Sequence, residues 1–149
     1  MATKTLTKPG AGLAPFNRPY NSYQLENTID FSVAANVLAQ NDIAELIAVP
    51  ANCSVIGIRW EILVVEGAAR NFAIGDGAGT SSYIATTSAN SLAEGAMALA
   101  LTEGTPNTIT GYSDGKYYAA ADTIDILAVT SGGLTTCKLR VVADIRDYN

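Results

Sequence analysis

The sequence contains no histidine, and this absence removes several kinds of chemistry. Histidine is the usual partner of a nucleophilic serine or cysteine, the commonest zinc ligand and the side chain that titrates near neutral pH. The two cysteines, Cys53 and Cys137, are too few for a disulfide framework. Both fall on the apolar side of predicted strands, so we expect buried free thiols. A disulfide bond between them is the alternative if their strands are neighbours.

Charged residues are also scarce, at 15% of the chain, and acidic residues outnumber basic ones by 14 to 9. The resulting net charge of −5 argues against nucleic acid as a partner. No apolar segment reaches the ~18 residues that a membrane helix needs. Because no apolar run follows Lys4 and Lys8, we expect no secretory signal and no membrane partner. The low cysteine count fits folding in a reducing cytoplasm.

The residues that are abundant favour β-structure. Apolar residues make up 48% of the chain but aromatic residues only 7%. Valine and isoleucine recur at alternating positions, and threonine, serine, glycine and asparagine lie between them. This mixture is typical of an all-β domain with loops of small residues. A length of 149 residues indicates one domain with a single substantial core.

The clearest pattern runs from Asp42 to Val65 and predicts two strands joined by a tight turn at residues 49–52. Pro50 ends the first strand because it lacks a backbone donor, and Asn52 tolerates left-handed geometry. In the second strand, one predicted face is directed to the core and carries Ser54, Ile56, Ile58, Trp60, Ile62 and Val64. The opposite face turns apolar at its end and consists of Val55, Gly57, Arg59, Glu61, Leu63 and Val65.

Further strands are expected on both sides of this pair, at residues 28–35, 70–74, 82–86, 96–101, 116–121, 123–129 and 135–145. In the last strand the apolar face holds Cys137, Leu139, Val141, Ala143 and Ile145. Loops or turns are expected at 66–69, 75–81, 103–107 and 111–115, a hairpin turn at 131–133, and one helical turn within 87–94. About eight or nine strands with longer loops after Ile74, Thr86 and Leu101 predict an antiparallel β-sandwich of jelly-roll type.

Residues 1–28 differ from the rest because they contain three of the five prolines and show no strand or helix period. We therefore predict an extended N-terminal arm over 1–28 and a sandwich domain over 29–149. A floppy tail is the alternative, but such tails usually lack apolar anchors. The residues of the arm predicted to bind a partner are Leu6, Leu13, Phe16, Arg18, Tyr20 and Tyr23.

The acidic and glycine-rich motifs do not assemble a catalytic or metal site. The Gly75-x-Gly77-x-Gly79 run lacks the Lys-Ser/Thr pair of a phosphate-binding loop. Asp122 and Asp125 are three positions apart, so in a strand they face opposite ways. Glu61 and Glu66 are likewise an odd number apart, and we expect Glu61 to pair with Arg59 or with a cross-strand cation. The prediction is therefore no enzyme, no metal and no cofactor.

Three tyrosines, Tyr112, Tyr117 and Tyr118, gather around the predicted turn at 111–115. Exposed aromatic side chains on a loop stack on sugars or dock on proteins. The alternative is that they cap one end of the sandwich.

Several motifs give the chain a resemblance to a known family. They are Asp42 with Leu46 to Ala51, Val64-Val65-Glu66-Gly67, Gly75-Asp76-Gly77, the run from Tyr118 to Leu127 and the closing strand from Lys138 to Ala143. Over residues 28–149 the chain resembles small virion proteins of tailed bacteriophages, and is most similar to jelly-roll capsid decoration, or cement, proteins. The resemblance carries over no catalytic residues.

The resemblance implies a non-enzymatic structural protein on the outer capsid surface of the virion. Such a protein would brace subunits of the major capsid protein, often as a homotrimer. The half-apolar second face, with Val55, Leu63 and Val65, would then need cover from a loop or a neighbouring chain. The first alternative is a head-fibre or receptor-binding module that contacts host glycans. The second is a lectin-like secreted domain, which the expected lack of a signal disfavours.

Overall fold

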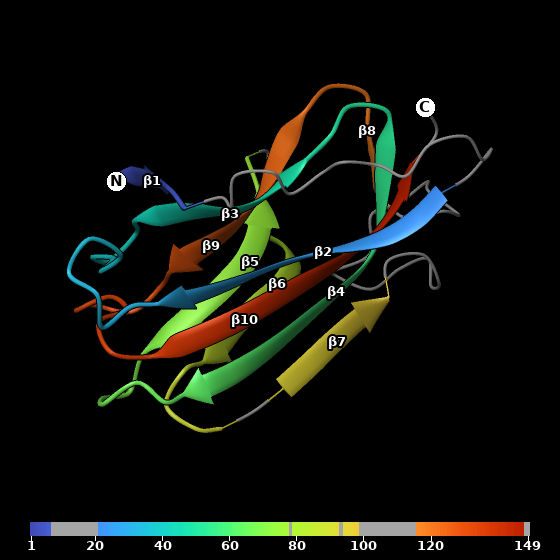
Figure 1. Ribbon diagram of the computed structural model, residues 1–149. Coiled ribbons are helices and arrows are strands. Elements are labelled where there is room, and N and C mark those ends of the chain that lie inside the picture. Colours follow the sequence, from blue (N-terminus) through green and yellow to red (C-terminus); the bar gives the residue numbers. More distant parts are fainter. Residues whose placement is uncertain (7–20, 78, 93, 99–115, 148–149) are drawn as a thin grey trace.

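A computed structural model describes residues 1–6, 21–77, 79–92, 94–98 and 116–147 (Figure 1). In these ranges the only regular secondary structure is β-strand, as the all-β prediction requires. They are β1 (Thr3–Thr5), β2 (Asn21–Asp30), β3 (Ile43–Val49), β4 (Cys53–Val64), β5 (Asn71–Asp76), β6 (Gly79–Ser88), β7 (Glu94–Ala98), β8 (Lys116–Tyr118), β9 (Asp122–Ala128) and β10 (Lys138–Asp147).

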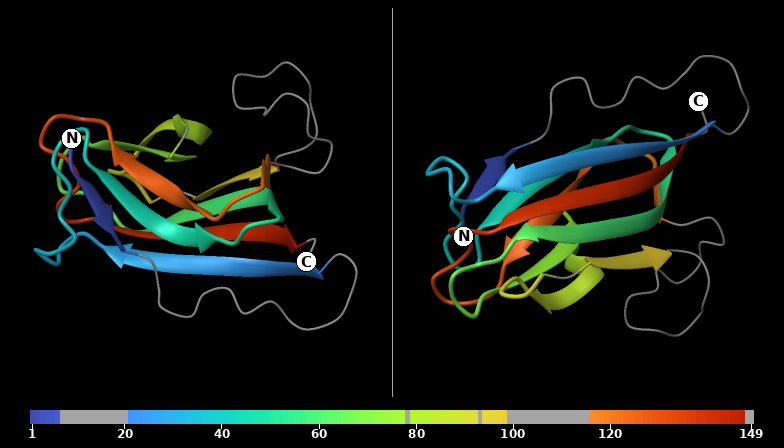
Figure 2. Two further views of the ribbon diagram at one scale, coloured as in Figure 1. Left: turned by 90° about the horizontal axis from the view of Figure 1, so that it is seen from above. Right: turned by 60° about the horizontal axis from the view of Figure 1, so that its bottom comes forward.

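The strands form two sheets that face each other as layers of a sandwich (Figure 2). One sheet has the order β1-β3-β9-β5-β6 and the other β2-β10-β4-β7, with β8 also beside β4. Every pairing is antiparallel except the one between β1 and β3. The core between the layers takes side chains from both sheets.

The pairing identifies the sandwich as a jelly roll. When the three-residue strands β1 and β8 are set aside, the first remaining strand pairs with the last, β2 with β10. The same nesting continues inward, with β3 beside β9, β4 beside β7 and β5 beside β6. This long antiparallel ribbon is wrapped so that β10 also pairs with β4, and β9 with β5. The predicted fold class is confirmed.

The two predicted tight turns exist, but they connect the sheets. The turn after Val49 leaves the first sheet and enters the second, with Asn52 at φ 58° as expected. The turn at 131–133 likewise joins β9 to β10 across the sandwich, so the predicted hairpin there is wrong. Gly133 has φ 67°, and a Cβ on it would lie 1.7 Å from the Leu38 carbonyl oxygen. Only glycine fits that close approach.

The alternation predicted for β4 is correct only from Ile58 to Ile62. A register shift after Ile62 leaves Leu63 as an extra residue, and Val64, predicted to face the core, is 49% exposed. Gly57 pairs with Asp144 and Val55 with Ile145, which leaves Ile56 as an extra residue in β4. A bulge of this kind reverses the side-chain phase. Ile58 and Ile62 are buried as predicted, whereas Val55 lies in the core and Ile56 is partly exposed. The apolar face predicted for the last strand, β10, is buried throughout.

Trp60 is half-buried, although complete burial between the sheets was predicted. Its ring meets Phe72 of the opposite sheet edge-on, with centroids 5.5 Å apart and an interplanar angle of 83°. On the edge strand β7 its partner is Gly95.

The N-terminal region is the largest correction. β1 pairs with β3, and β2 lies along the whole of β10, so residues 1–28 contain strands and the boundary at residue 28 falls inside β2. The apolar alternation of β2 was hidden by Asn27, which is buried at 3% exposure. Its amide donates to the carbonyls of Leu6, at 2.7 Å, and Leu46, at 2.8 Å. A polar residue on the core side breaks the sequence pattern while it ties β1 and β3 to β2.

Several shorter predictions also need correction. The strand predicted over 28–35 ends at Asp30, whose carboxylate accepts the Ser32 backbone N–H at 3.0 Å and so forms a turn. The predicted loop 75–81 is shorter, because β5 extends to Asp76 and β6 begins at Gly79. β6 continues to Ser88, and the described part of 87–94 is not helical. The turns at 103–107 and 111–115 lie outside the described residues.

Candidate functional site

The sandwich has two ends, which differ in chemistry. At the Tyr118 end, defined by Tyr118, Cys53 and Asp147, the strand β8 closes over β4. At the Glu66 end, defined by Glu66 and residues 134–137, the chain leaves β4 and enters β10. Cys53 lies at the first end and Cys137 at the second, so the two buried thiols are free, as predicted.

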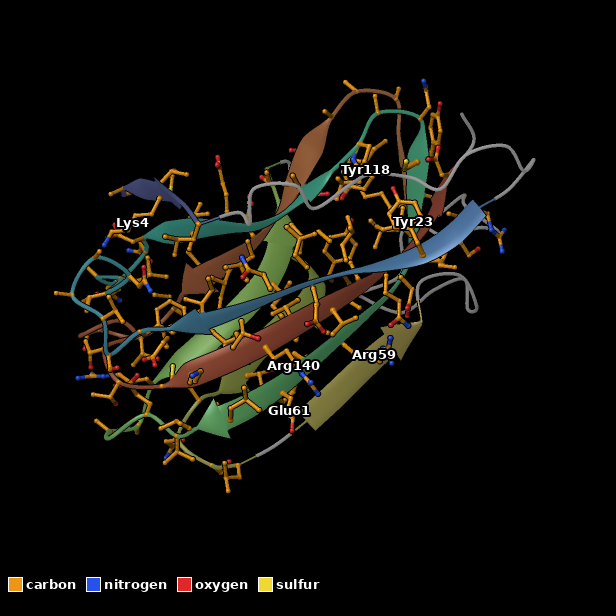
Figure 3. The ribbon with its side chains drawn as sticks, viewed as in Figure 1. Lys4, Tyr23, Arg59, Glu61, Tyr118 and Arg140 are labelled. Carbon is orange, nitrogen blue, oxygen red and sulfur yellow. The ribbon has the colours of Figure 1, made fainter. Side chains whose placement is uncertain are left out.

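A polar cluster fills the core at the Tyr118 end, where Tyr118 and Tyr23 lie (Figure 3). Tyr118 donates from its hydroxyl to Asp76 Oδ2 at 2.7 Å and also contacts the Tyr83 hydroxyl. Lys116 Nζ forms an ion pair with the same Asp76 oxygen. Burial raises the pKa of both Tyr83 and Tyr118, and their proximity to Asp122 and Asp125 adds to the shift.

The three predicted surface tyrosines therefore separate. Tyr118 is 4% exposed and belongs to the core, which corrects its assignment as a surface contact and supports the alternative that it caps the sandwich. Tyr117 points outward from β8, and its hydroxyl donates to Asn52 Oδ1 at 3.0 Å. Tyr112 lies outside the described residues. Alternation along a strand separates adjacent tyrosines, so sequence clustering alone does not make an aromatic patch.

Glu66 organises the opposite end. Its carboxylate accepts backbone N–H groups of Thr135 and Thr136, each at 3.0 Å, and of Cys137 at 3.1 Å. Both threonine hydroxyls donate to it as well, at 2.7 and 2.8 Å. Burial acts to raise the pKa of Glu66, but these hydrogen bonds outweigh it and lower the pKa to about 2. The ionised carboxylate thus fastens the β4–β5 connection to the start of β10.

Exposed large apolar side chains are concentrated at the Glu66 end. Of the seven among the described residues, Tyr117 lies at the Tyr118 end, and Met1 precedes Ala2, which bonds to Asp42 and Ile43. Register places Val64 opposite Lys138 and Lys138 opposite Asp30, and the Glu66 N–H donates to the Ala89 carbonyl. The other five, here called the apolar end, lie on or just after these segments and are Val33, Leu63, Val64, Val65 and Leu92.

The outer face of the sheet β2-β10-β4-β7 is, in contrast, hydrophilic. Arg140 pairs with Glu61 at 2.6 Å, and Arg59 pairs with Asp144 at 3.1 Å (Figure 3). Glu61 therefore takes the cross-strand cation that was predicted as one of two options. Because all four side chains are partly exposed, these pairs stabilise little and mark a solvated face.

Two of the six predicted arm residues are described, and both pack within their own chain. Leu6 and Tyr23 lie against the core cluster. Lys4 of β1 also makes its contacts within the chain, and its Nζ donates to the carbonyls of Ala35 and Val37. The other four, Leu13, Phe16, Arg18 and Tyr20, lie outside the described residues, and their partner contacts stay predictions.

Asp125 on β9 is the notable buried acid that sequence reasoning did not assign. It is 4% exposed, its register partner on β3 is Glu45, and its Oδ1 has no hydrogen-bond partner. Burial and the neighbouring charges of Glu45 and Asp122 raise the pKa of Asp125 to about 6, against a hydrogen bond from Thr123. In the described part of the chain no three acidic, histidine or cysteine side chains come together as a metal site. Nor is any helix there long and apolar enough to cross a membrane.

Comparison with known proteins gives matches by structure and none by sequence. No family model and no curated protein matches the chain. A chain in the capsid of Ralstonia phage GP4 aligns with a TM-score of 0.67 and 11% identity, covering 97% of this chain and 99% of that one. A chain in the acid-stable capsid of Helicobacter pylori bacteriophage KHP30 aligns with a TM-score of 0.58 and 9% identity, covering 86% of this chain and 89% of that one. A chain in the capsid asymmetric unit of cyanophage Pam1 aligns with a TM-score of 0.55 and 14% identity, covering 94% of this chain and 96% of that one.

These alignments show a shared fold. Each spans most of both chains, so the similarity concerns the whole molecule and not an isolated motif. At 9 to 14% identity, contacts and partners of those chains do not transfer to this one by the alignment alone.

Proposed function

We propose that the protein is a non-enzymatic component of a bacteriophage virion, a decoration or cement protein on the outer capsid surface. In this role it binds the major capsid protein and stabilises contacts between neighbouring subunits. We further propose that it acts as a homotrimer. The observation that carries the proposal is the end-to-end alignment with a chain of a phage capsid, which covers 97% of this chain and 99% of that one.

The distribution of surface chemistry supports a protein partner. The outer face of the sheet β2-β10-β4-β7 has paired charges and suits solvent. The apolar end presents five large side chains between 38% and 72% exposed. Apolar side chains gathered in one region of a surface mark protein contacts more often than chance placement does. We therefore assign the contact with capsid or sister subunits to the apolar end.

A binding experiment with capsids tests this function. The full chain is mixed with expanded capsids that lack it, and co-sedimentation is measured together with the capsid melting temperature. We expect saturable binding and a higher capsid melting temperature. Density for the jelly roll on the outer surface in a cryo-microscopy map would locate it. Capsids that neither bind the chain nor gain stability would contradict the proposal.

Paired variants test the docking end. Leu92→Asp and Val64→Asp place charges in the apolar end, at side chains 72% and 49% exposed, so the fold should tolerate them. We expect both to weaken capsid binding at least tenfold. Tyr117→Ser, at the opposite end, is the matched control and should bind as the wild type does. Loss of binding in Tyr117→Ser alone would move the contact to the Tyr118 end.

The head-fibre or glycan-binding alternative has less support. It requires a set of exposed aromatic side chains, and among the described tyrosines near β8 only Tyr117 faces outward. A single exposed ring makes a weaker sugar platform than the predicted group of three.

A further inference from the structure

Lys116 and Asp76 are brought together from opposite sheets at the Tyr118 end. Lys116 lies on β8, which pairs with β4, and Asp76 ends β5 in the other sheet. Their Nζ and Oδ2 atoms are in contact, with the Asp76 side chain 0% exposed and the Lys116 side chain 19% exposed. In the other ion pairs of the described chain, every side chain is at least 31% exposed. This pair is set apart by its burial.

The surroundings of the pair are aromatic and mostly buried. Lys116 Nζ lies 5.1 Å from the ring centroid of Tyr118 and 5.9 Å from that of Tyr83. The Tyr118 hydroxyl donates to Asp76 Oδ2 at 2.7 Å, which draws electron density from the carboxyl group. A second carboxylate is close, because a Cβ at Gly77 would lie 3.5 Å from Asp122 Oδ1 and Asp122 favours the charged form of Lys116.

Burial makes neutralisation of this pair less costly than it would be in water. Desolvation of a buried ion pair costs free energy that the mutual attraction need not return. Burial lowers the pKa of Lys116 even though Asp122 opposes the shift, so the uncharged amine is more accessible here than in water. An uncharged lysine amine is a nucleophile, and a protonated carboxyl group held against it has an electrophilic carbon. Both reactants are already fixed in contact, which removes most of the entropic cost of their encounter.

We propose that Lys116 and Asp76 condense into an intramolecular amide bond that joins the two sheets. Transfer of a proton from the ammonium group to the carboxylate first gives an amine and a carboxylic acid. The Nζ lone pair then attacks Asp76 Cγ, and a Cγ–N bond forms. The Asp122 carboxylate takes a proton from Nζ and delivers it to the departing hydroxyl. The Cγ–O bond breaks and one water molecule leaves, with no change of oxidation state. The departing oxygen is Oδ2, which Lys116 contacts and to which Tyr118 donates its hydrogen bond, and Oδ1 stays as the amide oxygen.

The bond would act as a covalent clasp between β5 and β8. It replaces two buried charges by one neutral amide and holds the Tyr118 end closed where the ladder between β8 and β4 is only three residues long. The inference is independent of the proposed function, because it concerns only contacts within the chain.

Intact-mass spectrometry of the purified full chain tests the proposal. We expect a mass lower by one water molecule than the sequence requires, in denaturant as well as in buffer. Tandem spectra of a protease digest should contain a branched peptide that joins the Asp76 segment to the Lys116 segment. An intact mass equal to the sequence mass overturns the proposal, whatever the variants do. A water loss located anywhere else in the chain overturns it as well.

Variants then assign the roles. Lys116→Arg keeps the positive charge but lacks the reacting amine, so its mass should equal its sequence mass. Asp122→Asn should leave most of the protein unreacted or slow the reaction at least tenfold. Lys138→Arg is the matched control, because Lys138 forms an exposed ion pair with Asp30 at 3.7 Å. It should retain the full water loss. Retention of that loss in Lys116→Arg would contradict the assignment.

Discussion

At the scale of single residues, two buried carboxylates behave in opposite ways. Glu66 accepts hydrogen bonds from three backbone N–H groups and two hydroxyls, so its ionised form belongs to the folded state. Asp125 is also buried, lies opposite Glu45 in the register of β9 with β3, and has one oxygen without a partner. The first carboxylate stabilises the fold at neutral pH and the second opposes it.

Glu66→Gln should lower the free energy of unfolding at pH 7 by about 3 kcal/mol. The pKa of Glu66 falls from 4.5 to about 2 on folding, so its stabilisation is present above pH 4.5 and is lost as the pH falls toward 2. Urea unfolding across that window should show a steeper loss of stability in the wild type than in Glu66→Gln. Glu61→Gln, at an exposed pair, is the control and should change little.

Asp125→Asn should instead raise the stability at neutral pH, by about 2 kcal/mol. The pKa of Asp125 rises from 3.8 to about 6 on folding. The stabilisation from its protonated form is complete below pH 3.8 and is lost as the pH rises through 6, where the charged form remains in a buried position. The gain from Asp125→Asn should therefore disappear below pH 4. A variant less stable than the wild type at pH 8 would contradict this account.

Trp60→Ala should cost about 2 kcal/mol, less than the ~3–5 kcal/mol of a fully buried tryptophan. The indole is half-buried and its best contact is the edge of Phe72. The wild-type tryptophan emission maximum should accordingly lie between those of buried and solvated indole. An emission maximum typical of water would show that the packing against Phe72 does not form.

At the scale of elements, the N-terminal strands belong to the sandwich. β2 contributes ten residues to the ladder with β10, and Asn27 of β2 joins the carbonyl groups of Leu6 and Leu46. The Ile56 bulge shows the same dependence on neighbours, since it is the register with β10 that moves Val55 into the core. Edges and bulges here are defined by pairing partners far away in the chain.

Deletion of residues 2–24 should therefore abolish cooperative folding. It removes β1, with its hydrogen bonds to β3, and the part of β2 that holds Tyr23. Deletion of residues 2–5 alone removes only β1 and should leave a folded protein with a lower melting temperature. Circular dichroism during thermal unfolding measures both. A sharp, unchanged unfolding transition after deletion of residues 2–24 would contradict this prediction and show that the segment is a separate arm.

At the scale of the whole molecule, the jelly roll presents one hydrophilic sheet face and one apolar end. Sedimentation at increasing concentration should show a trimer that dissociates on dilution, because five exposed apolar side chains at one end favour self-contact. Leu92→Asp should shift this equilibrium toward the monomer, and Tyr117→Ser should not. A wild-type monomer at high concentration would contradict the trimer, and capsid binding would then have to be explained with single copies.

The sequence by itself determined the fold class and most strands of the second half of the chain. Alternation of apolar residues in β10 needs no tertiary information, because each side chain simply follows the pleat. The tight turn at 49–52 and the free cysteines were equally predictable, from the local chemistry of Pro50 and Asn52 and from the number of thiols.

Only the tertiary structure decided which strands are partners and which polar residues lie inside. The bulge at Ile56 and the inward position of Asn27 both break the local period. The bulge follows from the register with β10, and the position of Asn27 follows from its bonds to the carbonyls of Leu6 and Leu46. The cluster of Asp76, Tyr83, Lys116 and Tyr118 joins segments that are 42 residues apart at their extremes (118 − 76). Contacts of that separation depend on how the ribbon wraps, and no local pattern records the wrapping.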